Sequence, residues 1–433
     1  MPAEQSANTI CAPVASGPRF PLWGLLALAT AAFTDVMTDL LPAGVLPQMS
    51  GALHVPPERI GVLVSAFAVA SSVAAIPVTT ALRGLPRRPV LIGVLTGFAV
   101  FNAVTAVSAS YLLTFGARLL AGVMGGTLWS MLAGYAARMV PAERRGRATA
   151  IVLAGITAAM AAGIPAGAAL ATVSGWRPIF ALLAAVPLLL VAWVRWQVPA
   201  LPGEAATDRP SLRRVGSLPG IRTVLAVTVL LLTGHQAMYT YAAPFAARSG
   251  PGDASLVLFV FGAATIAGLG ITGALADRHL RSVLLAALAM IATAMLVLGL
   301  ITHNQATLLT AVALWGAAFG AAPTLLQTAL IDASGPVSAD VATSMQTTVY
   351  NIGIAAGSLA GGVILDHTGA AALPWATALL TTVALAIVAA ARRHSFPATR
   401  PAHKNPAAQT AKTTRIGGSP KCDPAQQNTP RTG

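Results

Sequence analysis

Two aspartates stand inside an apolar stretch near the start of the chain. The stretch FTDVMTDLLPAG, residues 33–44, carries Asp35 and Asp39 within a run of apolar residues from about 21 to 46. The carboxylates are four residues apart, so on a helix they lie on one face. Burial and mutual repulsion both favour the neutral form of a carboxyl group, and we expect at least one of the pair to hold a proton near neutral pH.

The composition explains why these carboxylates are unusual. Hydrophobic residues make up 55% of the chain and charged residues 9%, and the mean hydropathy is +0.72. A soluble domain has about 25% charged residues, so the composition is typical of an integral membrane protein. A carboxylate in the bilayer core is costly unless it is paired, protonated or facing water, which makes Asp35 and Asp39 functional candidates. The alternative is that both only join helices.

Arg118 is the basic residue that falls inside an apolar run. At 1.5 Å per residue, Asp39 and Arg118 each lie about 10 Å below the outer surface, so we predict that they pair. Asp35 lies about one turn deeper, and it is the better candidate for exchanging a proton with a central cavity. A purely structural clamp is the alternative role for Arg118.

Apolar runs long enough to cross a bilayer recur along the chain. They cover residues 20–46, 60–82, 88–109, 111–139, 147–173, 178–198, 221–247, 254–276, 281–302, 305–331, 339–365 and 371–392. The pattern predicts an all-α integral membrane fold with twelve transmembrane helices in two six-helix halves. The expected segments are a cytoplasmic N-terminal segment 1–19, an N-terminal half 20–198, a cytoplasmic linker 199–220, a C-terminal half 221–392, and a disordered basic cytoplasmic tail 393–433.

The basic residues predict the orientation, because cytoplasmic loops carry an excess of Lys and Arg. With a cytoplasmic N-terminus, only Arg59, Arg177, Arg248 and the intramembrane Arg118 of the 27 Lys and Arg residues fall elsewhere. We therefore expect both termini in the cytoplasm. The net charge of +14 then belongs to loops that face anionic membrane lipid, and no nucleic acid partner is expected.

Similar features recur in the two halves at one fixed separation. Arg87 and Arg281 fall in corresponding cytoplasmic loops, and the glycines of GIPAG, Gly163 and Gly167, recur at the same offset in the eleventh predicted helix. Transporters built on repeats show such weak internal symmetry. The spacing predicts an internal duplication.

Five motifs, in order along the chain, carry a family resemblance. They are TDLLPAGVLP, RLLAGVMGG, PAERRGRATA followed by GIPAG and GWRPIF, GALADRHLR, and NIGIAAGSLAGGVILDHTGAAALPW. Together they resemble the major facilitator superfamily, and within it the twelve-helix drug:proton antiporters that include arabinose-efflux-like and chloramphenicol-resistance-like exporters. The resemblance, from about residue 22 to 392, implies a functional monomer in the bacterial inner (plasma) membrane. The first-half loop departs from the family's gate motif, because Thr79 and Arg83 stand where Gly and Asp would fall.

The resemblance also implies roles for three groups of residues. Proton coupling is expected at Asp35, Asp39 and Arg118. Gating is expected at Gly273, Asp277, Arg278, Arg281, Arg87 and Arg88. The antiporter motif comprises Gly155, Gly163, Pro165 and Gly167, which permit close packing and a bend. We expect Asp277 to face the start of the eleventh helix, where the dipole favours a carboxylate, and Arg278 and Arg281 to form pairs across the loop. Simple anchoring of the loop is the alternative for the arginines.

Polar side chains near the middle of the bilayer are candidates for lining the substrate cavity. They are His235, Gln236, Tyr239, Gln327, Tyr350, Asn351 and Trp129. His235 lies near the midplane and can titrate. The alternative for His235 and the aromatic residues is ordinary packing.

The absence of other motifs narrows the function. The sequence has no GxxxxGK[ST] loop, HExxH motif or Cys/His cluster, so ATP is not the expected driver, and no enzyme activity, metal or cofactor is expected. Two aspartates and one arginine give the first-half site a formal charge of −1, which suits neutral or cationic compounds. We therefore expect a proton-coupled exporter of small lipophilic compounds that works by alternating access. Export of a polar metabolite such as a sugar or nucleoside is the first alternative, and a non-transporting membrane sensor or scaffold is the second.

Overall fold

The structure is a computed structural model of the chain. It describes residues 20–82, 84–141, 144–203, 212–249, 254–300, 304–335, 338–391 and 396, apart from a few side chains that include those of residues 271–278. Of the two compact units, Met1–Pro397 and Ala398–Gly433, only the first contains described residues. The expected N-terminal segment 1–19 lies outside the described residues, and so does the expected tail except for Phe396.

The first half is a sequence of long helices joined by short connections. Its elements are α1 (Leu22–Gly44), α2 (Leu46–Leu53), α3 (Pro57–Leu82), α4 (Arg87–Val107), α5 (Tyr111–Arg138), α6 (Arg145–Ala158), the π-helix η2 (Ala159–Gly163), α7 (Ile164–Ser174) and α8 (Arg177–Gln197). The fifth expected helix is therefore divided into α6, η2 and α7. A π-turn at this place is understandable, because Pro165 has no N–H for the carbonyl of Ala161 four residues earlier.

The second half repeats this plan. Its elements are α10 (Ile221–Thr240), α11 (Ala242–Ala246), the 3-10 turn η3 (Ala247–Ser249), α12 (Ala254–Leu300), α13 (Gln305–Ser334), α14 (Ala339–Thr368), the 3-10 turn η4 (Ala370–Ala372) and α15 (Leu373–Ala390), with the short α9 (Leu212–Gly216) before them. The eighth and ninth expected helices both fall in α12, which has a break in helical geometry at His279.

Eleven helices among the described residues are long and apolar enough to cross a membrane, and Ala254–Gly270 is a further, shorter apolar helix. The predicted all-α membrane fold is confirmed. The predicted internal duplication gains a structural counterpart at two glycines. Gly175 ends α7 with φ 78°, and Gly369 ends α14 with φ 81°, a conformation that favours glycine at helix ends.

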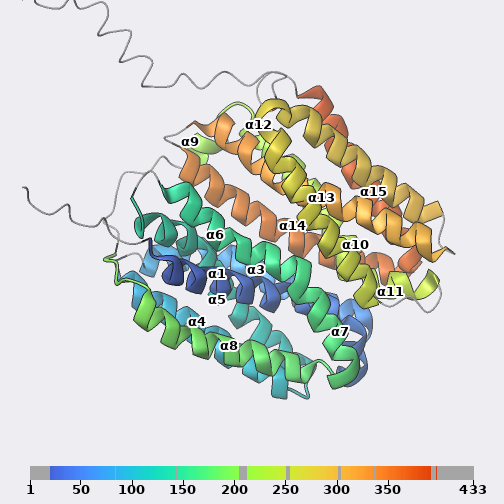
Figure 1. Ribbon diagram of the computed structural model, residues 1–433. Helices are drawn as coiled ribbons and strands as arrows, with labels where there is room; N and C mark the ends of the chain where they lie inside the picture. The colour runs from blue at the N-terminus through green and yellow to red at the C-terminus, as the bar shows by residue number, and fades with distance from the viewer. Residues whose placement is uncertain are drawn as a thin grey trace, which may run out of the picture. The chain divides into compact units, whose positions relative to one another are not determined.

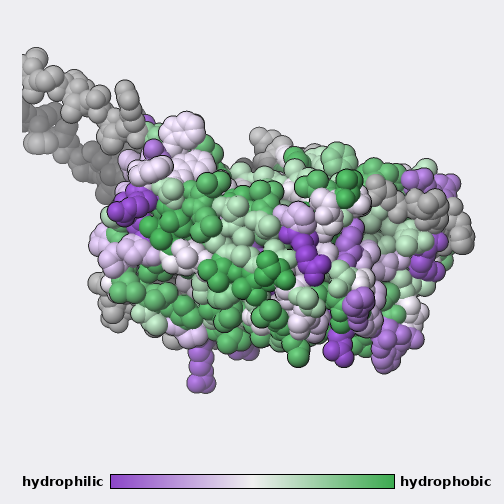
Figure 2. All heavy atoms as spheres, turned by 90° about the horizontal axis from the view of Figure 1, so that it is seen from below, coloured by the Kyte–Doolittle hydropathy of each residue, from purple (hydrophilic) through white to green (hydrophobic). Residues whose placement is uncertain are grey.

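Large apolar side chains cover the outside of the bundle. Leu112, Val173 and Leu189 are all more than 70% exposed, and Figure 2 shows hydrophobic residues spread across one face of the molecule. An apolar surface of this extent is costly in water. It is the surface expected of helices that face lipid.

The two halves meet along α3 and α14, which run side by side in Figure 1. Further contacts join α1 to α10, α2 to α11, and both η2 and α7 to α12. A buried hydrogen bond crosses the junction, since the Ser65 hydroxyl donates to the Ala355 carbonyl at 3.0 Å. We call the end of the bundle where α3 begins and α14 ends the α2–α11 end.

Candidate functional site

Asp35 and Asp39 lie one turn apart in the middle of the first half. Helix α1 packs against α3, α5, α6 and α8, so it is surrounded by protein along much of its length. Asp35 is 2% exposed and Asp39 is 8% exposed. One carboxylate oxygen of each, Oδ1, is buried without a hydrogen-bond partner among the described residues. Such a group is costly in a low-dielectric interior, which makes the pair a candidate site for a proton or a ligand.

Arg118 reaches α1 from α5 and is completely buried. Its guanidinium donates to three backbone carbonyls, with Nη2 at 2.8 Å from the Asp39 carbonyl, Nε at 3.4 Å from the Leu63 carbonyl, and Nη1 bonded to the Thr38 carbonyl. It also lies over the Phe67 ring, 4.8 Å from the centroid, as expected for a desolvated cation.

Arg118 and Asp39 were expected to form an ion pair between their side chains, and this expectation is wrong as to the acceptor atom. The two residues do meet, but the guanidinium binds the main-chain oxygen of Asp39 and not its carboxylate. The physical reason lies in Pro42, which sits inside α1. Proline has no N–H, so the Thr38 carbonyl four residues earlier lacks its helical partner. Arg118 supplies the missing donors.

A close approach by α5 holds Asp35 in place. A Cβ at Gly125 would lie 2.8 Å from Asp35 Oδ1 and 2.7 Å from the Phe67 ring, so a side chain here would displace one of these two groups. One turn further along α5, the Trp129 side chain interacts with the Asp35 carboxyl group. Trp129 was expected to line a substrate cavity. The structure places it beside the candidate proton site.

His235 belongs to a cluster of aromatic rings in the second half. It stacks on Phe319 with ring centroids 3.5 Å apart and an interplanar angle of 10°, and Tyr239, Phe261 and Trp315 surround it. His235 is 4% exposed, and its Nδ1 has no hydrogen-bond partner in the described part of the chain. In this conformation the ring is enclosed by packing and does not face an open cavity.

The other cavity candidates are divided between buried and half-buried positions. Gln236 donates to the Thr240 hydroxyl at 3.0 Å, and Asn351 donates to the Thr347 carbonyl at 3.1 Å. Both side-chain amides thus donate to a group four residues earlier or later in their own helix. Gln327 and Tyr350 are half-buried. Their expected role in lining the substrate cavity stays a prediction.

Two gating candidates, Arg88 and Arg281, donate hydrogen bonds to carbonyls at the ends of helices. Arg88 Nη1 donates to the Arg195 and Val198 carbonyls, at 3.3 and 3.4 Å, where α8 ends. Arg281 donates to the Ala389 carbonyl at 2.9 Å, where α15 ends, and to the Phe396 carbonyl at 3.1 Å. The last carbonyls of a helix lack internal partners and attract cations.

Arg88 therefore binds the end of α8 in the first half as Arg281 binds the end of α15 in the second. Arg87 is buried, and its backbone N–H donates to the Leu201 carbonyl at 2.9 Å. The helix α12 includes Gly273, Asp277 and Arg278, but their side chains lie outside those that the structure describes. Their expected gating contacts stay a prediction.

The antiporter-motif glycines pack directly against α1. A Cβ at Gly155 would lie 2.0 Å from the Ala29 carbonyl oxygen, and Cβ atoms at Gly163 and Gly167 would meet the side chains of Met37 and Leu41. Pro165 lies in the first turn of α7, directly after the π-helix η2. The motif therefore brings the fifth span against the helix that carries both aspartates.

The comparison with known families assigns the chain to a family. A model described as the Major Facilitator Superfamily matches residues 28–336 and 225–425. The chain belongs to the major facilitator superfamily. It is a membrane transporter and not an enzyme, and the resemblance expected from the five motifs is confirmed.

Relatives of this major facilitator protein support the same assignment. The "Chloramphenicol resistance protein" of Streptomyces lividans is 34% identical over 376 residues, which are 85% of this chain and 95% of that protein. Two solved structures share the fold. The human organic anion transporter MFSD10 (TETRAN) has a TM-score of 0.62 at 21% identity and covers 85% of this chain and 98% of its own. A bacterial homolog of the human lysosomal transporter Spinster has a TM-score of 0.66 at 15% identity, and the match covers 89% of this chain and 100% of that chain.

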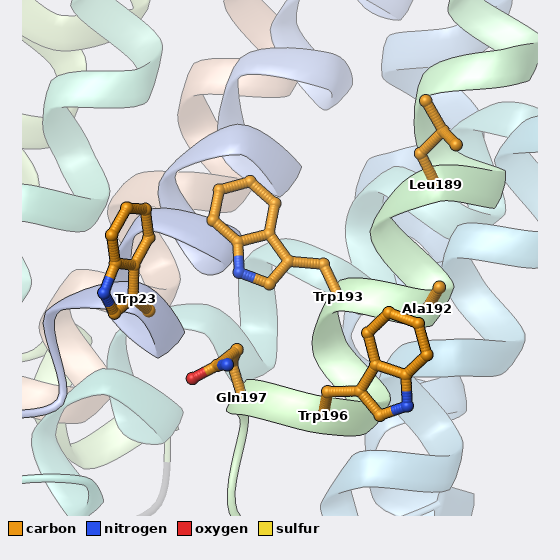
Figure 3. A pocket seen from close by; sticks show the side chains of 6 residues that line it. All are labelled: Trp23, Leu189, Ala192, Trp193, Trp196 and Gln197. Atoms are coloured by element: carbon orange, nitrogen blue, oxygen red, sulfur yellow. The ribbon is translucent and has the colours of Figure 1, made fainter.

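A surface groove of this transporter lies away from the aspartates. It has a volume of about 510 Å³ and is lined by Trp23, Leu189, Ala192, Trp193, Trp196 and Gln197 (Figure 3). Trp23 precedes Asp35 by about 18 Å along α1 at 1.5 Å per residue. Tryptophans gather where a bilayer meets water, so we assign this groove to the membrane interface and not to the candidate site.

Proposed function

We propose that this transporter exports small lipophilic compounds, neutral or singly cationic, in exchange for protons. The observation that carries the proposal is the pair of buried aspartates beside a cation, Arg118, that is already occupied by main-chain carbonyls. Without a direct ion pair, an ionised carboxylate at this depth is expensive, and a proton removes the charge. Asp35 is the proposed proton carrier, because it lies about one turn deeper than Asp39 and is the less exposed of the two.

A proton supplies enough energy for uphill export. The membrane potential provides about 2.3 kcal/mol per charge per 100 mV, and 1.4 kcal/mol corresponds to about tenfold in concentration. One proton therefore supports a gradient of roughly fifty-fold. Alternating access requires the two halves to separate at one end and then at the other, and here they meet through α3 with α14 and through α7 with α12.

The proposed substrate class is supported by the charge of the first-half site and by a related protein. Two aspartates and one arginine leave the first-half site with a formal charge of −1 before protonation, which favours cationic or neutral compounds over anions. The Streptomyces lividans relative, a chloramphenicol resistance protein, supports efflux of a neutral antibiotic. We further propose a monomer in the bacterial inner membrane, with both termini in the cytoplasm, as the distribution of Lys and Arg favours.

Export of a polar metabolite is the second candidate function. It is favoured by His235, whose buried Nδ1 has no partner in the described structure and would bond a hydroxylated solute in a conformation in which the surrounding rings separate. The half-buried Gln327 offers a further donor and acceptor. Export of lipophilic compounds remains the leading proposal, because the aromatic rings around His235 are closed against polar solutes in this conformation.

A susceptibility panel tests the proposal. A bacterial host without its major pumps expresses wild type, Asp35→Asn, or the matched surface variant Asp366→Asn at equal levels. The panel contains lipophilic cations, phenicols and toxic sugar analogues. We expect resistance to phenicols or cations in wild type and Asp366→Asn, and its loss in Asp35→Asn. Resistance that survives in Asp35→Asn excludes Asp35 as the essential carrier, and resistance confined to sugar analogues favours the polar-metabolite function.

A further inference from the structure

Tyr241 stands where the seventh span of the fold breaks near the α2–α11 end. Helix α10 ends at Thr240, α11 begins at Ala242, and the backbone between them leaves helical geometry with φ −110° and ψ 25°. The Tyr241 side chain is completely buried. The break therefore places a large polar-tipped ring inside the protein at a point where the two halves meet.

Hydrogen bonds within the second half fix the Tyr241 hydroxyl. It donates to the Ser358 carbonyl on α14 at 2.9 Å. The Ser358 hydroxyl is 2.9 Å from the Thr240 hydroxyl, which accepts from Gln236 at 3.0 Å. Because all of these partners belong to α10 and α14, the ring is held as part of the second half.

The tip of the ring occupies a slot made of glycines from both halves. A Cβ at Gly61 on α3 would lie 1.8 Å from the Tyr241 hydroxyl oxygen and 2.6 Å from Cζ. A Cβ at Gly362 on α14 would lie 2.7 Å from the same oxygen. No side chain fits at Gly61 while Tyr241 keeps this position, because real Cβ atoms do not approach other atoms so closely.

The slot lies next to the polar bond that joins the halves. Ser65, one turn after Gly61 on α3, donates to the Ala355 carbonyl of α14. The first-half wall of the slot is thus held against the second half at two successive turns of α3. Glu58, one turn before Gly61, also borders the slot, since its backbone oxygen lies 3.6 Å from the Cβ position of Gly362.

We propose that Tyr241 is a latch that keeps the two halves closed at the α2–α11 end. Its hydroxyl stays bonded to Ser358 when the halves separate, because that bond lies within one half. What separation breaks is the fit of the ring tip against Gly61. The latch therefore sets how readily this end of the transporter opens, and it acts independently of which compound or ion is carried.

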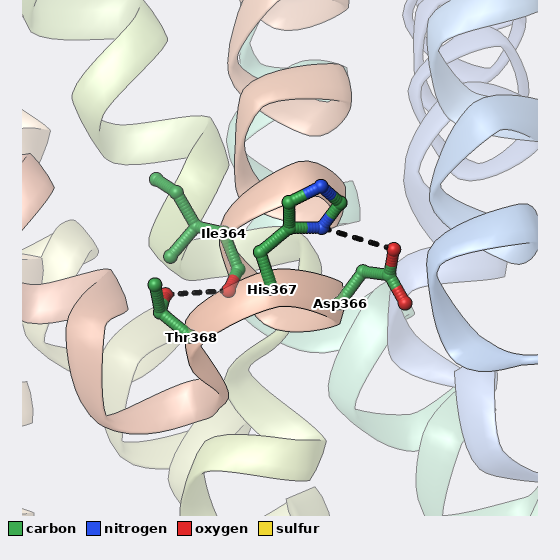
Figure 4. Close-up of polar contacts among 4 residues, drawn as sticks. All are labelled: Ile364, Asp366, His367 and Thr368. Carbon is green, nitrogen blue, oxygen red and sulfur yellow. Dashed lines mark hydrogen bonds and ion pairs between the residues drawn. The ribbon is translucent and has the colours of Figure 1, made fainter.

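Spin-label distances across the α2–α11 end test the latch without any substrate. Labels at Ser110→Cys in the first half and His367→Cys in the second report the separation, in a chain with Cys11→Ser and Cys422→Ser. Both labelled positions are exposed, and His367 makes a surface contact with Asp366 at 3.1 Å, beside the Thr368–Ile364 hydrogen bond (Figure 4). The purified protein is measured in nanodiscs, as wild type, Gly61→Ala and Tyr241→Leu.

We expect Gly61→Ala and Tyr241→Leu each to enlarge the longer-distance population relative to the wild type. The control is Gly51→Ala in α2, at the same end, where an added Cβ meets no described atom within 4 Å, and it should match the wild type. If Gly61→Ala does not fold, Tyr241→Leu carries the test alone. Distance distributions identical to the wild type in every variant that folds would overturn the latch.

A double variant separates the slot from a general effect of Gly61. In the Tyr241→Leu background the ring tip is gone, so Gly61→Ala should add little further opening. Two residues in contact show such non-additive behaviour. If Gly61→Ala opens the protein equally in the wild-type background and in the Tyr241→Leu background, the fit between Tyr241 and Gly61 is not the cause and the proposal fails.

Discussion

The guanidinium of Arg118 on α5 donates to the backbone carbonyl of Thr38 on α1, the acceptor that Pro42 leaves without a helical partner. A buried arginine thus supplies the hydrogen-bond donor that the proline removes, at the turn of α1 that carries Asp39. In doing so its guanidinium binds main-chain oxygens in place of the two carboxylates. This relationship links the proline of the TDLLPAG motif to the proposed proton site.

Replacement of Arg118 should damage both stability and transport. In Arg118→Ala, the carbonyls of Thr38 and Asp39 lose donors that water cannot replace, and each unsatisfied buried group costs about 1–3 kcal/mol. We expect a lower Tm of the detergent-purified protein and no resistance in cells. Arg118→Lys should recover only part of the Tm, because one ammonium cannot reproduce the planar fork. A Tm equal to that of the wild type in Arg118→Ala would contradict the role of these bonds.

Pro42→Ala should separate stability from function. The new N–H at residue 42 can bond the Thr38 carbonyl, and an alanine inside a helix is favoured over proline by up to about 3 kcal/mol. We expect an unchanged or higher Tm, together with weaker resistance, because Arg118 loses an acceptor and shifts beside Asp39. Full resistance in Pro42→Ala would show that the Thr38 bond is not needed for transport.

Gly125→Ala should affect transport through contact with Asp35. The added methyl group would lie 2.8 Å from Asp35 Oδ1, and overpacking of this kind costs about 1–3 kcal/mol. Gly116→Ala is the matched control, because it lies in the same helix and its Cβ would meet no described atom within 4 Å. Resistance should fall in Gly125→Ala and stay normal in Gly116→Ala. Equal resistance in the two variants would argue against a constrained Asp35.

Arg281→Gln tests whether this arginine caps a helix or gates the transporter. Loss of its bonds to the Ala389 and Phe396 carbonyls should lower the Tm, because a hydrogen bond to a charged group contributes about 1.5–3 kcal/mol to stability. The Ser110–His367 distance distribution should be unchanged. A shift in that distribution would favour the gating role that the sequence motif implies.

Much of the fold could be predicted from hydrophobicity alone. The apolar runs located the long helices, because a bilayer requires about 20 apolar residues per crossing. The runs did not indicate α2, since a short helix in a connection leaves no transmembrane pattern, and the run 221–247 did not indicate the break between α10 and α11. The break of the fifth span at η2 could be inferred from Pro165, but a π-turn is only one of several ways to accommodate a proline.

The sequence predicted which residues of the candidate site lie close together, but it did not predict which of their atoms form hydrogen bonds. Spacing and depth brought Asp39 and Arg118 together, yet charge alone favoured a carboxylate partner, and the structure gives a carbonyl. The signal that could have shown this is the four-residue separation of Thr38 and Pro42. Gly125 belongs to the RLLAGVMGG motif, but the motif did not indicate its approach to Asp35, because that depends on how closely α5 approaches α1. His235 was expected near a cavity, but the rings of α12 and α13 that enclose it come from distant parts of the sequence.

Proton exchange at Asp35 is the central claim, and a proton-flux assay tests it most directly. Everted membrane vesicles that hold a pH gradient receive the first compound to which the susceptibility panel shows resistance. We predict that the compound dissipates the gradient in vesicles with wild type or Asp366→Asn, and leaves it intact in vesicles with Asp35→Asn. Dissipation by Asp35→Asn at the wild-type rate would contradict the account and move the proton to another group.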